Sequence, residues 1–301
     1  HGHGPARADD PYYRHLTKCG INATLTTFNM SGGVDFDDVN NRGIDGQWIS
    51  HTNGRFNTDS HTPTYGASAW AEPIAQFGDG SYVAEAGRAN IHGRRLDQIA
   101  QDLADGLVHC AGNNGGWYYS CNGNGGDAST NGWAPEALRL LERKYGVETY
   151  QAAKDRQRTW LQDHCNNGNC TYHHGGPKLS GNALVGYGWV DDQVYDGAAG
   201  SQHRQHVDSV SWIISDGAWG RYNNNLRGLY YTYAATKGLR SFVPEIKYLP
   251  NGNDWNAMLT RNLLRRQNAD GSWDWAGGWS WAYAVNRPTR TGMVTQIIQS
   301  W

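Results

Sequence analysis

The stretch that decides the fold occupies residues 115–146 and reads GGWYYSCNGNGGDASTNGWAPEALRLLERKYG. A glycine-aromatic opening is followed by a turn rich in glycine and asparagine, and then by a helical pattern. Trp133, Ala137 and Leu141 keep the spacing that places apolar side chains on one face of a helix. A basic last turn and a terminal glycine mark the helix end. We therefore predict a turn leading into a helix over 133–145.

The same arrangement recurs along the chain at intervals of roughly fifty residues, which is typical of a repeat protein. A second helix is predicted over 147–163, so one repeat is a helical hairpin plus a turn. In each turn glycine permits the chain reversal, and the aromatic ring can wedge between neighbouring hairpins. The repeat residues are therefore interpreted as structural. The recurrences begin at residues 64, 171, 217 and 270, with TYGASAW, TYHHGG, GAWG and DGSWD.

The last recurrence resembles a known family. Residues 267–273, QNADGSW, are similar to the Q-x-x-D-G-S-W repeat of the prenyltransferase and squalene-cyclase superfamily, and helix openings of the Thr-x-Gly type accompany it. The resemblance implies an all-α fold, an α/α toroid of repeated helical hairpins in which glycine-aromatic turns join inner to outer helices. We expect an irregular N-terminal extension over 1–60 that packs on the ring, and a toroid domain over 61–301.

The composition excludes two functional classes. The formal net charge is -2 and the pI is about 6.7, so the chain lacks the basic field that attracts nucleic acid. No run approaches the roughly 18 apolar residues of a membrane-spanning helix. Trp 14 and Tyr 17 stand against Phe 5, so much of the apolar material is aromatic and amphipathic.

The five cysteines indicate an exported protein, either secreted or located in the periplasm or at the cell surface. Two local disulfides are expected, Cys110 with Cys121 and Cys165 with Cys170, and Cys19 is then the odd cysteine without an assigned partner. One alternative is a reduced cytosolic chain. A zinc site is the other, although no Cys-x-x-Cys pair exists. Four histidines flank these cysteines and would be its further ligands: His109, His164, His173 and His174.

The predicted extension carries an acidic cluster. Its sequence Asp35-Phe36-Asp37-Asp38 matches the Asp-x-Asp-Asp motif with which class II terpenoid cyclases of the superfamily protonate an alkene, and Asp37 would be the acid. In those cyclases the motif opens an inner helix, whereas a turn follows it here. A calcium site formed by Asp35, Asp37, Asp38 and Asp45 is the alternative, with spacing unlike an EF-hand. Apart from this calcium, we expect no required cofactor.

Helical toroids also carry polysaccharide lyases and glycoside hydrolases, which is an analogy at the level of fold. A glycosidase needs two opposed carboxylates. Glu72 and Glu136 fall on two predicted inner helices, and Asp191 with Asp192 ends another. A hydrolase therefore remains one alternative.

A lyase needs a group that neutralises the uronate carboxylate, a base and an acid, and toroidal lyases use Asn or Arg with His and Tyr. Asn131, His174, Tyr187 and Arg227 occur in an order that resembles that of hyaluronate-type lyases. We predict β-elimination on a uronate-containing glycan with these four residues. Each also has a structural interpretation: Asn131 as a helix cap, His174 in a turn, Tyr187 in the core and Arg227 as a surface charge. Aromatic residues expected to stack on sugar are Trp70, Trp133 and Tyr230.

The main alternative is a non-catalytic extracellular module that binds glycans, adheres or self-assembles. Exposed aromatic rings would stack on sugars or become buried between subunits. Arginines outnumber lysines by 20 to 6, and guanidinium groups favour durable planar contacts. The expected partners are thus a polysaccharide or glycan and further copies of the chain.

Overall fold

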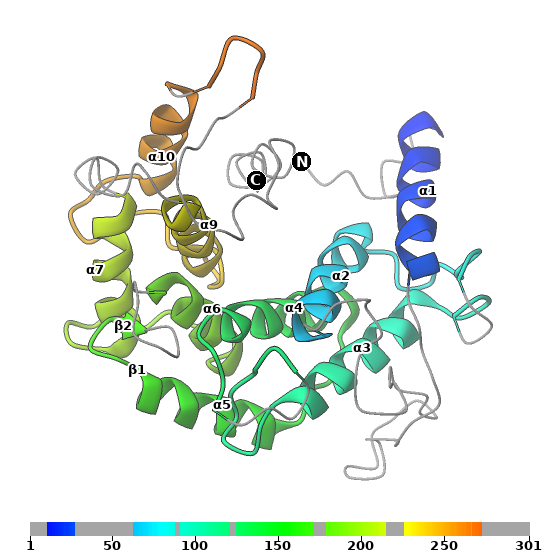
Figure 1. Cartoon of the computed structure of the whole chain (residues 1–301), viewed down its shortest axis with the longest axis horizontal. Coiled ribbons are helices and arrows are strands. Elements are labelled where there is room, and N and C mark those ends of the chain that lie inside the picture. The colour runs from blue at the N-terminus through cyan, green and yellow to red at the C-terminus, as the bar shows by residue number, and fades with distance from the viewer. Residues whose placement is uncertain are drawn as a thin grey trace. The chain divides into compact units, whose positions relative to one another are not determined.

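The computed structural model shows a mostly helical chain whose only strands, among the residues it describes, form one short hairpin (Figure 1). The predicted all-α class is confirmed at this level, and closure of the helices into a ring stays a prediction. None of the described helices is both long and apolar enough to cross a membrane. The described residues are 11–27, 63–87, 91–120, 125–170, 179–214, 226–265 and 267–272.

The chain divides into two compact units, His1–Trp160 and Leu161–Trp301. The first contains α1 (Pro11–Thr27), α2 (Pro63–Phe77), α3 (Leu96–Cys110) and α4 (Thr130–Tyr145). Helix α5 (Gln151–His164) carries the boundary between the units. The second unit contains β1 (Cys165–Asn166), β2 (Asn169–Cys170), α6 (Ser180–Val190), α7 (Gln202–Ile214), α9 (Leu226–Leu239) and α10 (Trp255–Leu264).

Helix α4 is the centre of the first unit. It packs mainly against α2, while α3 contacts both of these helices and α1 rests on α2 (Figure 1). Leu138 and Leu141 of α4 are completely buried, as their spacing predicts. The helix ends where expected, because Gly146 adopts the left-handed conformation with φ of 65° and its N–H bonds to the carbonyl of Glu142. It begins at Thr130, three residues before the predicted start.

Helix α6 is the centre of the second unit, and all of its residues are buried. It packs closely on α9, and α7 contacts both helices. The close approach depends on Gly181, where an added Cβ would lie 2.3 Å from the backbone carbon of Ala234. Helix α10 in turn contacts α7.

The turns before the helices repeat in structure as well as in sequence. Isolated β-bridges join Val83 to Arg95 before α3, Ala111 to Trp117 before α4 and Tyr248 to Asp254 before α10. An aspartate side chain also accepts hydrogen bonds from the backbone N–H and the hydroxyl of the serine two residues later. This arrangement occurs at Asp79–Ser81, Asp127–Ser129 and Asp270–Ser272. The structural interpretation of the repeat turns is therefore supported, and Asp79–Ser81 is a recurrence that our sequence analysis missed.

Helix α1 lies within the segment that we expected to be irregular. Residues 11–27 form this helix, and its Ile21 and Leu25 are buried. The sequence signal is weak because β-branched residues and Gly20 interrupt the pattern, and both have low helix propensity. Packing against α2 therefore stabilises a helix that the local sequence pattern does not predict. The predicted boundary at residue 60 lies outside the described residues.

Candidate functional site

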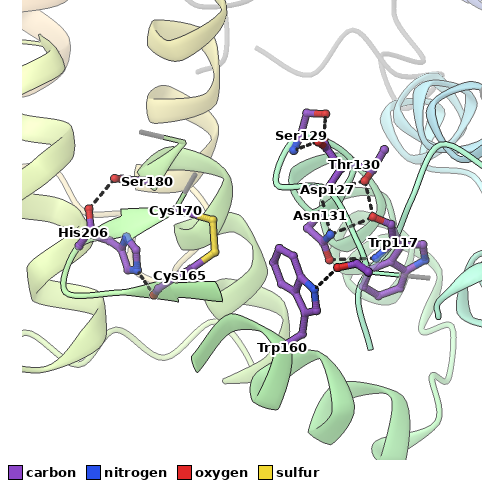
Figure 2. The surroundings of a disulfide bond; sticks show 12 residues. Trp117, Asp127, Ser129, Thr130, Asn131, Trp160, Cys165, Cys170, Ser180 and His206 are labelled. Carbon is purple, nitrogen blue, oxygen red and sulfur yellow. Dashed lines mark hydrogen bonds between the residues drawn. A yellow bond between two sulfur atoms is a disulfide. The ribbon is translucent and has the colours of Figure 1, made fainter. Parts of the chain in front are cut away.

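Asn131, the predicted carboxylate-neutralising residue, lies in the buried turn that begins α4 (Figure 2). Its Oδ1 accepts a hydrogen bond from the Trp117 N–H at 3.1 Å. Its Nδ2 donates to the carbonyls of Trp117 at 3.0 Å and Asp127 at 2.8 Å. With 1% of its surface exposed, the amide is committed to the backbone of the preceding turn. These contacts are structural, but they are not those of a helix cap, because the N-cap of α4 is Ser129.

Two indole rings hold the same turn. Trp117 is completely buried, and its Nε1 donates to the carbonyl of Leu107 at 2.7 Å. Trp160 donates from Nε1 to the carbonyl of Gly125 at 3.0 Å (Figure 2). A Cβ added to Gly116 would lie 2.4 Å from that indole nitrogen, so glycine is required there by close approach. The glycine-aromatic pattern is thus a packing device in the first unit.

Tyr187, the predicted catalytic tyrosine, lies on α6 in the second unit and is only 3% exposed. Its ring packs against two histidines of α7, with centroid distances of 5.1 Å to His203 and 5.7 Å to His206. His203 also contacts Tyr195 and Phe242. Tyr187, His203 and His206 thus form a buried cluster in the second unit, and Tyr187 is the predicted catalytic residue in it.

His203 has both ring nitrogens engaged. The backbone N–H of Asp196 donates to Nδ1 at 2.8 Å, so Nδ1 carries no proton. The proton is therefore on Nε2, which lies 2.7 Å from Oδ2 of Asp191. This contact orients a neutral imidazole. The lone pair that a general base would use is already occupied by the Asp196 N–H.

His206 is completely buried and connects α7 to the disulfide hairpin (Figure 2). Its Nε2 lies 2.9 Å from the carbonyl of Cys165, so this nitrogen is the donor. Burial is the main reason why the pKa of His206 falls from 6.5 to about 4; the Cys165 carbonyl opposes the shift, and the nearby His203 adds to it. The ring is therefore uncharged at neutral pH.

The hairpin itself confirms one cysteine prediction. A disulfide joins Cys165 to Cys170, and the hydroxyl of Ser180 donates to the Gly168 carbonyl at 2.8 Å, which ties the hairpin to α6. Cys110 is also disulfide-bonded, and its predicted partner Cys121 lies outside the described residues. Cys19 is free and exposed.

The other predicted site residues are distributed over several elements. Asn131 and Tyr187 belong to different units. Arg227 and Tyr230 fall on α9, Trp70 falls on α2, and Trp133 is half-buried on α4. The other predicted residues lie outside the described ones: His173, His174, Asp35, Asp37, Asp38 and Asp45.

The carboxylates and thiols considered for other chemistries have structural partners. Glu136 accepts from Arg139 at 2.9 Å in a buried pair within α4, and Glu72 accepts a long hydrogen bond from Gln76. Cys165 and Cys170 are oxidised, so neither supplies a thiolate for zinc. The described part of the chain contains no group of three metal-ligating side chains.

Large aromatic side chains reach solvent at a few positions. Trp212 of α7 is 48% exposed and Tyr248, in the turn before α10, is 57% exposed. In the first unit Tyr150 is 39% exposed. The sequence does not single out these three residues, because residue type alone does not separate an exposed aromatic ring from a buried one.

His203 and His206 were also missed, although a signal exists. With Val207, Val210 and Ile214 they occupy the buried positions of α7, at the spacing of a single helix face. Histidines in that register are expected to be buried.

No protein-family model matches this chain, and neither a curated protein nor a solved structure shows significant similarity to it. The function is therefore argued from the residues of the chain itself.

Proposed function

We propose that this chain is a non-catalytic extracellular module that binds glycans through exposed aromatic rings. The observation that carries the proposal is the exposure of Trp212 and Tyr248, because flat aromatic faces stack on the C–H faces of sugar rings. Both rings belong to the second unit, on α7 and on the turn before α10, two helices that pack together.

The state of the polar residues supports binding over catalysis. The amide of Asn131 is buried and bonded to backbone, and Tyr187 is enclosed by histidine rings. Neither group is presented to a substrate. The disulfide Cys165–Cys170 is compatible with an extracellular location.

The test is affinity electrophoresis of the purified chain through gels that contain different polysaccharides. Trp212→Ala and Tyr248→Ala should each weaken binding about tenfold, which corresponds to ~1.4 kcal/mol and matches the typical worth of an aromatic contact. Val194→Ala is the matched control, because Val194 is 65% exposed but carries no ring. Binding that survives both aromatic substitutions would contradict the assigned surface. Absence of retardation by any polysaccharide would contradict glycan binding.

A uronate lyase is the second candidate, favoured by the contact of Tyr187 with two imidazoles. Its test is the ultraviolet absorbance of unsaturated sugar ends formed from uronate polysaccharides. A signal that Tyr187→Phe abolishes, with unchanged stability, would replace the binding proposal by the lyase. A signal that survives Tyr187→Phe would place the reaction elsewhere in the chain.

A further inference from the structure

The second unit contains a cluster of side chains that is built around uncharged histidines. His203 and His206 are three residues apart on α7, so they share one face of the helix. They are 6% and 0% exposed, and both pack against Tyr187 of α6. We name the contact of these three residues, with Asp191 and the Cys165 carbonyl, the α6–α7 latch.

His206 has no way to hold a second proton in this position. Its Nε2–H already donates to the Cys165 carbonyl. Its Nδ1 is buried, and no hydrogen-bond partner for it lies among the described residues. A proton on Nδ1 would create a buried cation with no acceptor among the described residues, which is strongly unfavourable. The charged ring must therefore reach solvent, and this requires α7 to separate from α6.

His203 has a different restriction. A second proton on Nδ1 would point at the N–H of Asp196, so that hydrogen bond would break. The carboxylate of Asp191 would still accompany the charged ring through Nε2. His203 therefore bonds to the loop at Asp196, whereas His206 bonds to the hairpin through the Cys165 carbonyl.

The charged and titratable groups around the latch do not offset the free-energy cost of a second proton on His206. The facing groups are Tyr187 of α6 and Asp191 just beyond its end, and Asp191 contacts His203. From the following loop Tyr195 stacks on His203. On α7 itself Arg204 pairs with Asp208, and the β1 hairpin presents a backbone carbonyl. Helices α9 and α10 also pack on α7. The cations Lys237 of α9 and Arg240 just beyond its end lie over the rings of Tyr233 and Trp255.

We propose that the α6–α7 latch is a pH-operated conformational device, which is closed at neutral pH and opens in mildly acidic solution when His206 takes up a proton. The direction of the response follows from the two protonation states. The open state binds the proton with an ordinary histidine pKa near 6.5, whereas the closed state binds it only at about 4. The latch is thus fully stable above pH 6.5 and weakens as the pH falls toward 4. Linkage predicts that the opening constant rises about 25-fold between pH 7.4 and pH 5.

The experiment is hydrogen–deuterium exchange of the whole chain, measured by mass spectrometry at these two pH values and corrected for the intrinsic exchange rate. Peptides from α7 should show the roughly 25-fold rise in opening, while peptides from α4 serve as the internal reference. His206→Gln keeps an N–H donor for the Cys165 carbonyl but cannot be protonated, so its α7 should be insensitive to pH. His92→Gln is the matched control, because His92 is exposed in the first unit, and it should respond as the wild type does.

Unchanged exchange of α7 at pH 5, or an equal rise in His206→Gln, would overturn the proposal. A second measurement covers the case in which His206→Gln does not fold. Nuclear magnetic resonance of the wild type should show a His206 imidazole that remains uncharged in the closed state at pH 5. Titration of that imidazole near pH 6.5 with α7 still protected would equally overturn the latch.

Discussion

Replacement of Asn131 by alanine tests whether this residue is structural. The substitution removes three hydrogen bonds, one from the Trp117 N–H and two to the carbonyls of Trp117 and Asp127. The carbonyls of Trp117 and Asp127 keep backbone donors, the Asp127 N–H and the Asn131 N–H respectively. The loss of the two side-chain hydrogen bonds therefore leaves neither carbonyl unpaired. The buried Trp117 N–H loses its side-chain acceptor. At about 1 kcal/mol for each bond, we expect the free energy of unfolding of the first unit to fall by ~3 kcal/mol.

Asn131→Asp separates hydrogen bonding from shape. The new carboxylate keeps one acceptor for the Trp117 N–H but places its second oxygen against the two carbonyls that Nδ2 now contacts at 3.0 Å and 2.8 Å. Repulsion and burial of charge should make this variant less stable than Asn131→Ala at neutral pH. Part of the loss should be recovered in acid, where a protonated carboxyl group can donate to one carbonyl.

The assay is urea denaturation followed by hydrogen exchange of α4 peptides, which reports on the unit that contains Asn131. Asn113→Ala is the control, because Asn113 is exposed in the segment between α3 and Trp117 and its loss should change stability by less than about 0.5 kcal/mol. If the free energy of unfolding of Asn131→Ala lies within about 1 kcal/mol of the wild-type value, the structural role is refuted. It would also reopen the role of this amide in binding a uronate carboxylate.

Two further predictions concern packing and the hairpin. Gly181→Ala should destabilise the second unit by about 2–3 kcal/mol, because the added Cβ meets the backbone of α9. Gly20→Ala should instead stabilise the first unit by about 0.5–1 kcal/mol, because the added Cβ meets nothing within 4 Å in α1. Thermal melts should show a lower melting temperature for Gly181→Ala and a higher one for Gly20→Ala. Equal shifts of the melting temperature would contradict close contact between α6 and α9. Replacing Cys165 and Cys170 together by serine should cost about 2 kcal/mol, as expected for a short closed loop. Melting temperatures of the wild type and the variant, with and without reductant, measure the stabilisation by the disulfide. An unchanged melting temperature would show that the disulfide contributes no stability.

Local patterns predicted the helical class and several details. The end of α4 at Gly146 and the Cys165–Cys170 disulfide were both predicted correctly, because each depends on residues that are neighbours in the chain. The start of α4 was placed three residues late, since Thr130 and Asn131 enter the helix by bonding to the preceding turn. Helix α5 begins at Gln151, four residues after its predicted start. Helix α1 was missed because it depends on packing.

The candidate site was less predictable than the fold. Residue type suggested that Asn131 and Tyr187 could do chemistry, and the sequence left open the alternative that Tyr187 is a core residue; the structure buries both. The histidines that contact Tyr187 are sixteen and nineteen positions further along the chain, on α7. Their helical register indicates burial, but only the packing of α7 on α6 places them against that tyrosine.

The amino-acid sequence by itself determined the helical repeats, their glycine-aromatic turns and the hairpin disulfide, because propensity, capping and short-loop pairing act between nearby residues. Tertiary structure alone decided which polar groups are used internally and which rings face solvent. The amide of Asn131 is occupied by backbone from an earlier turn, His206 is held uncharged between α6 and the hairpin, and Trp212 remains exposed. The physical reason is that burial and hydrogen-bond satisfaction depend on which segments meet in space, and distant segments meet only when the chain is folded.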